Sequence, residues 1–163
     1  MGEDIKSKFE AVFQKHAASK LAAAKAQDVK ESKWAAFLRA FLDARETTIR
    51  PAMTEVGEYV RGNGYHYEIS TVDDSISNDK NHRPISAAIR ITFFTGDDRA
   101  PVGNFPHFTV ICDKERERVG FHESTISPGR GGHAGGVGGA PLSELTTEMV
   151  QEKIIKVLSE AFK

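Results

Sequence analysis

The first sixty residues carry apolar side chains at helical spacing. Ile5, Phe9 and Val12 recur at steps of three and four residues, and the alanine-rich stretch 17–26 favours a helix. A longer apolar stripe follows, formed by Trp34, Phe37, Leu38, Phe41, Leu42, Ile49, Met53, Val56 and Val60. These patterns predict two N-terminal helices, with a break or hairpin between residues 27 and 32.

The second helical stripe contains a proline and is followed by glycines. Pro51 lacks the N–H that would continue helical hydrogen bonding, so we predict a kink or two abutting helices near Arg50. Gly62 and Gly64 follow the stripe and predict the end of this helix.

The middle of the chain changes to a period of two residues, which is typical of strands. Apolar and polar side chains alternate in residues 65–72, 85–94, 105–112 and 119–126. The connections between these segments are polar and contain no helical pattern, so the four strands predict an antiparallel meander. One face of such a sheet is expected to carry the helices, and the other face to be polar.

The end of the chain predicts one more helix. Thr146 is a suitable N-cap, and Val150, Ile154 and Val157 then share one face. The expected fold class is therefore α+β, with two N-terminal helices, a four-stranded antiparallel meander and a C-terminal helix on one sheet face. We assign residues 1–31 to an N-terminal helical arm and residues 32–163 to a single α+β domain.

A glycine-rich run lies between the last predicted strand and the last predicted helix. Seven of the eleven residues 129–139 are glycine, and Arg130 and His133 are the only titratable side chains among them. Glycine loses more backbone freedom on folding than any other residue, so we expect a long connector, ordered only by what it touches. Its free N–H groups and Arg130 could cradle an anion. Gly129-x-Gly131-x-x-Ala134 imitates the dinucleotide-binding motif, but no helix is expected to begin there, and the Walker A motif is absent.

The polar face of the predicted sheet holds further candidate ligand-binding residues, namely His66, Arg90, His107 and His122. Three imidazoles and the carboxylate of Glu68 would suit zinc if the strand register brought them together. Their spacing matches no metal motif, so we expect a solvated face, or one covered by a second subunit. We predict no metal and no cofactor.

Catalytic patterns are weak in this sequence. His122 and Ser124 share a strand face, but the Gly-x-Ser-x-Gly elbow of serine hydrolases is absent. Cys112 follows two apolar residues and is expected to be a small core residue rather than a reactive thiol. The sequence therefore favours a protein that is not an enzyme.

Charge and composition limit the classes of partner that this protein is expected to bind. The 163 residues carry a net charge of -1, and the lysines of the first helix are interleaved with acids, so nucleic-acid binding is not expected. A single cysteine and the lack of an apolar signal or membrane segment indicate a cytoplasmic location with no membrane partner.

Two functional hypotheses follow. The first is a cytoplasmic, non-enzymatic binding or assembly protein that forms homo-oligomers through its N-terminal helices and offers its outer sheet face and glycine-rich run to a protein partner. The alternative is a small anionic-ligand-binding protein or enzyme with a site under residues 129–139. There Arg130 would hold the anion, and His133 or His122 would be the acid–base group.

Overall fold

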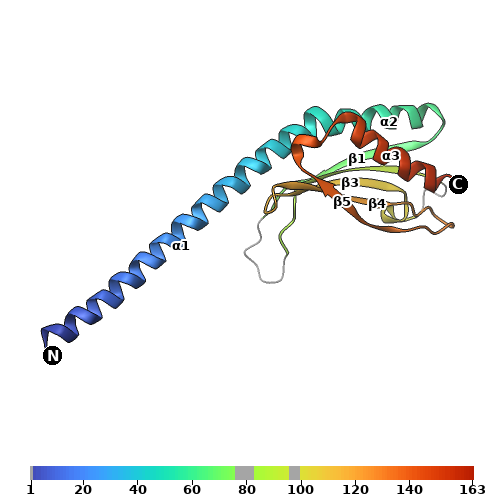
Figure 1. The fold of residues 1–163 in the computed structure, drawn as a ribbon. Coiled ribbons are helices and arrows are strands. Elements are labelled where there is room, and N and C mark those ends of the chain that lie inside the picture. Colours follow the sequence, from blue (N-terminus) through green and yellow to red (C-terminus); the bar gives the residue numbers. More distant parts are fainter. Residues whose placement is uncertain (1, 76–82, 96–99) are drawn as a thin grey trace. The chain divides into compact units, whose positions relative to one another are not determined.

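The computed structural model describes residues 2–75, 83–95 and 100–163. They form an α+β fold in which helices precede and follow the strands of an antiparallel sheet along the chain (Figure 1). The helices are α1 (Glu3–Ala44), α2 (Arg50–Gly62) and α3 (Thr147–Ala161); the strands are β1 (His66–Val72), β2 (Ala88–Phe94), β3 (His107–Asp113), β4 (Arg118–Ser124) and β5 (Ala134–Ala140). Residues 1–36 and 37–163 form separate units, and the boundary between them lies inside α1.

The predicted break between residues 27 and 32 is wrong, because α1 is continuous from Glu3 to Ala44. Asp28 and Ser32, the expected N-caps, lie inside this helix. The segment contains neither glycine nor proline, and Gln27 donates a hydrogen bond to Glu31 one turn later, at 3.2 Å. Polar residues that favour caps were therefore not enough to end a helix of such high intrinsic propensity.

The irregularity expected near Pro51 is a five-residue π-helical turn, Arg45–Ile49, that joins α1 to α2 without leaving the helical path. Arg50 donates its backbone N–H to the carbonyl of Arg45, five residues back. Because Pro51 has no N–H, the α-helical hydrogen bond to Thr47 is lost, and the wider turn ends just before it. Two predicted helices are thus one joined helix from residue 3 to residue 62.

The sheet has five strands rather than four, in the order β1-β2-β3-β4-β5. Every neighbouring pair is antiparallel, so the predicted meander is confirmed and extended by one strand. The added strand is β5, which comes from the glycine-rich run that we expected to be a connector. It pairs with β4 from Val119↔Ala140 to Ser124↔Ala134, with a bulge between Gly120 and His122.

Close approach to β4 explains the glycines of β5. A Cβ added at Gly139 would lie 2.3 Å from the carbonyl oxygen of Val119, which is closer than any real side chain tolerates. Gly138, at the bulge, has a φ of 90°, a region that favours glycine. The backbone hydrogen bonds of β4 offset the cost of ordering this run, which no local propensity predicts.

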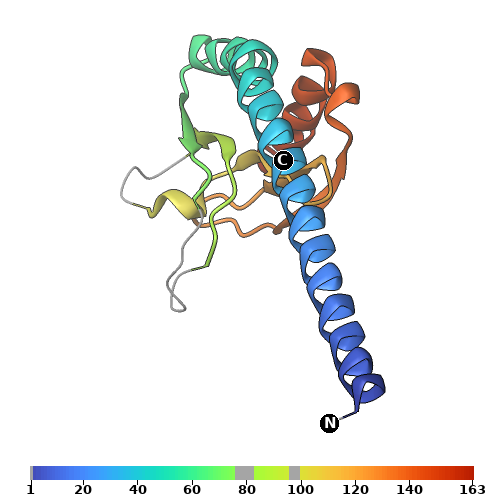
Figure 2. The same ribbon diagram turned by 90° about the vertical axis from the view of Figure 1, so that its left-hand side faces the viewer.

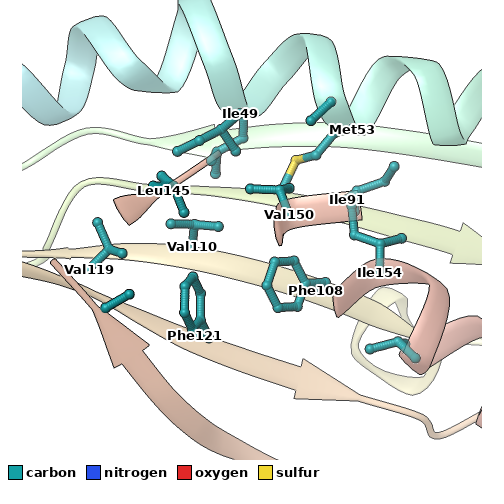
Figure 3. Packing of buried hydrophobic residues seen from close by; sticks show 14 of the residues in the cluster. Ile49, Met53, Ile91, Phe108, Val110, Val119, Phe121, Leu145, Val150 and Ile154 are labelled. Carbon is teal, nitrogen blue, oxygen red and sulfur yellow. The ribbon is translucent and has the colours of Figure 1, made fainter. Parts of the chain in front are cut away.

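The core lies between one sheet face and the helices α2 and α3. Figure 1 and Figure 2 both show these two helices over the same face. Figure 3 shows Met53 of α2 and Ile154 of α3 packed toward Phe108 and Phe121 of the sheet. Thr146 caps α3 as predicted, since its hydroxyl accepts a hydrogen bond from the N–H of Met149 at 3.1 Å. The expected packing of the C-terminal helix is confirmed.

Candidate functional site

The outer face of the sheet, opposite the core, presents two rows of mainly polar residues that run across the strands. Strand pairing aligns Glu68, Thr92, His107, Ser124 and Ala134 in the first row. The second row aligns Ser70, Arg90, Thr109, His122 and Gly136. This register brings Arg90, His107 and His122, three of the predicted site residues, together at the centre of the sheet.

The centre of this face is buried, not solvated as we expected. Thr92, His107 and Thr109 are each 5% exposed or less, and Ser124 is fully buried. Phe94 follows Thr92 by two residues on β2, beside the first row, and packs edge to face with Phe105, with ring centroids 5.0 Å apart. The alternation of the sequence predicted which residues share the face, but not that they would be shielded from water.

The two central histidines stack on each other. Their ring planes are 8° apart and their centroids are separated by 5.7 Å. Nδ1 of His107 lies 3.0 Å from the carbonyl oxygen of Phe105, whereas Nδ1 of His122 is buried and has no hydrogen-bond partner in the described part of the chain. His66, the fourth candidate, is exposed on the edge strand β1 and pairs with Phe94. Within the described residues, no three ligand-type side chains converge as a metal ion would require.

Arg90 places a positive charge beside these histidines. It is partly buried, and its Nε donates a hydrogen bond to the hydroxyl of Thr109 at 2.8 Å. Burial lowers the pKa of Arg90, but a guanidinium stays protonated at neutral pH. The face can therefore attract an anion at this point.

Stability should fall in acid because of His107. Burial, and then the nearby charge of Arg90, lowers the pKa of His107 in the folded chain below its usual value. As the pH falls, His107 is therefore protonated in the unfolded chain before it is protonated in the folded chain. The stability that neutral His107 contributes is complete above about pH 6.5 and is lost as the pH falls through the pKa of the folded chain. We expect the urea midpoint to change less between about pH 7.5 and about pH 5 in His107→Gln than in the native chain. An equal change in both would contradict this assignment.

Arg130 and His133 form hydrogen bonds with residues other than Arg90, His107 and His122. Arg130 donates from Nη2 to the main-chain oxygen of Lys163. His133 contacts the hydroxyl of Thr125 through Nδ1 at 3.2 Å and the buried carboxylate of Glu123 through Nε2 at 3.2 Å. Glu123 and His122 are consecutive residues of β4, so their side chains point to opposite faces of the strand. His133 therefore contacts a residue of the face opposite His122.

Cys112 is a core residue, as the sequence indicated. It is 1% exposed, and burial raises the pKa of its thiol to about 11. The thiolate needed for nucleophilic chemistry is therefore scarce at neutral pH.

A second surface, which sequence reasoning missed, is an apolar groove between α2 and α3. Its volume is about 710 Å³, and its walls include Tyr59, Ile155 and Phe162, which are 76%, 54% and 41% exposed. Tyr65 and Phe162 meet edge to face, with ring centroids 5.0 Å apart. Ile155 and Phe162 lie beside the predicted apolar stripe of the last helix and not within it. Large apolar residues outside the buried stripe were the sequence signal that could have predicted an exposed apolar surface.

Comparison of the chain with known protein families, curated proteins and solved structures found no match. Among the described helices, none combines the length and the apolar character that crossing a bilayer requires.

Proposed function

We propose that this protein is a non-enzymatic assembly protein that forms a homodimer or higher oligomer through residues 3–36 of α1. The observation that carries the proposal is the exposure of this segment. Every residue from 2 to 33 is exposed, and Phe41 is the only buried residue of α1. The first unit thus has no core of its own.

The exposed segment nevertheless carries large apolar side chains on one side. Ile5, Phe9 and Phe13 are 48%, 53% and 68% exposed, and Val12 lies between them. Steps of four, three and one residues place these four side chains on a single stripe. Burying a phenylalanine contributes about 1.5–3 kcal/mol, so pairing two such stripes is favourable.

The rest of the segment suits close pairing of helices. Alanine dominates residues 17–26, so two backbones can approach closely there. Seven lysines and five acids are interleaved in residues 1–33, so two copies repel each other only weakly. An isolated helix of this polarity gains most of its stability from packing, which a second copy would supply.

The oligomeric state of the full chain tests this proposal. Sedimentation velocity and light scattering over a range of micromolar concentrations should show a dimer or a larger species that dissociates on dilution. A monomer throughout this range would contradict the proposal.

A further inference from the structure

Two hollows adjoin on the outer face of the sheet. The first, of about 380 Å³, has Arg90 and Thr109 among its lining residues, with Val72 and Ala88 beside them. The second, of about 450 Å³, is lined in part by His122 and Gly120. Ile85, Ser86 and Ile111 line both hollows, so one small molecule could occupy the two together.

Arg90 is the cation of the first hollow. Its Nε is held by Thr109, and within residues 2–75, 83–95 and 100–163 no carboxylate pairs with its guanidinium. Partial burial of a guanidinium removes part of its hydration, and an anion bound against it would offset this cost.

The remaining walls of the first hollow are largely apolar. Val72 and Ile85 are 46% and 51% exposed, and Ala88 and Ile111 pair with each other on the neighbouring strands β2 and β3. A cation at one side and apolar walls around it suit a ligand that joins one anionic group to an apolar body.

The second hollow is kept open by glycines that the fold does not need. A Cβ added at Gly120 would meet no atom within 4 Å, and one at Gly136 would meet only the carbonyl oxygen of Phe121 at 3.8 Å. Neither residue has a positive φ, so both positions could hold side chains without backbone strain. Their absence preserves space beside His122.

The far end of the second hollow disfavours a highly charged ligand. Asp74, Asp113 and Glu115 lie there with a single lysine, Lys114, which is already paired with Asp74 at 2.7 Å. A phosphate with two charges would meet these carboxylates, whereas a carboxylate on Arg90 brings one charge and a planar match to the guanidinium.

We propose that the outer sheet face binds small monocarboxylates that have an apolar body. The carboxylate lies against Arg90, and the apolar body lies between Val72, Ala88 and Ile111 and extends toward Gly120. This site is independent of self-association through α1.

Phenylacetate is a suitable probe for the full-length chain, with neutral phenylacetamide as its matched control. Titrations followed by proton–nitrogen correlation NMR should show binding of phenylacetate at least about tenfold tighter than that of the amide, which is about 1.4 kcal/mol. Arg90→Gln should remove this preference, while Arg61→Gln, which changes an exposed arginine on α2, should retain it.

Gly120→Val tests the shape of the site separately from its charge. The side chain should enter open space, leave the thermal midpoint unchanged or higher, and weaken phenylacetate binding at least about tenfold. Three results would overturn the proposal: no shift at millimolar phenylacetate, equal affinity for the amide, or full affinity in folded Arg90→Gln. Loss of self-association would leave these titrations unaffected.

Discussion

Replacing Gly139 by alanine should destabilise the protein by about 1–3 kcal/mol, because the new methyl group overlaps backbone rather than a movable side chain. The added Cβ would lie 2.3 Å from the carbonyl oxygen of Val119, and the guanidinium of Arg118 is also close. The edge strand must then move away from β4 and lose hydrogen bonds, or β4 must shift within the core. The free energy of unfolding in urea measures this effect.

Gly135→Ala is the matched control for this prediction. Gly135 lies in the same strand, has no positive φ, and its added Cβ would meet no atom within 4 Å. It should leave the protein as stable as the native chain or about 0.5 kcal/mol more stable, because alanine restricts the unfolded chain. Equal stability of the two variants would show that β5 does not pair this closely with β4.

Replacing both Phe9 and Phe13 by glutamate should dissociate the oligomer. Two phenylalanines per chain contribute about 3–6 kcal/mol when fully buried, and each 1.4 kcal/mol changes a dissociation constant about tenfold. We therefore expect the dissociation constant to rise at least about 100-fold, measured by sedimentation equilibrium. Both side chains are exposed within their own chain, so the helix content of the monomer should not fall for lack of intrachain contacts.

The control adds the same charges on the opposite side of α1. Ser7 and Ala11 lie about 120–160° around the helix from Phe9 and Phe13, so Ser7→Glu with Ala11→Glu should leave assembly largely intact. Ile155→Glu places a charge in the groove between α2 and α3 and should also leave it intact. Dissociation by Ile155→Glu would instead indicate that the groove forms part of the interface.

Much of the fold could be predicted because its signals are local. The α3 stripe of Val150, Ile154 and Val157 is buried as its spacing indicated, and four strands occur within two or three residues of their expected bounds. The break predicted in α1 does not occur, because the helix propensity of the surrounding residues outweighs the preference of Asp28 and Ser32 for N-cap positions.

The candidate site was predictable only in part. Alternation correctly placed Arg90, His107 and His122 on one face, and pairing then brought them together. A single site formed by Arg130, His133 and His122 remains a prediction. The hydrogen bonds of Arg130 and His133 go to other residues, Lys163 and Glu123 respectively. The register of β5 against β4 decides which side chains near the glycine-rich run meet, and the spacing of residues in the sequence does not predict this register.

The amino-acid sequence by itself determined which segments are helical, four strands and their apolar faces, because side-chain periodicity follows directly from backbone geometry. The continuity of α1 was not among these correct predictions. Only the tertiary structure decided that residues 134–140 are a strand, because glycine has little strand propensity and needs the hydrogen bonds of β4 to be ordered. It also decided that His107 and Thr109 are buried, since exposure depends on what the rest of the chain places over them. The hollows beside Arg90 and Gly120 arise in the same way, from strands that meet only after folding.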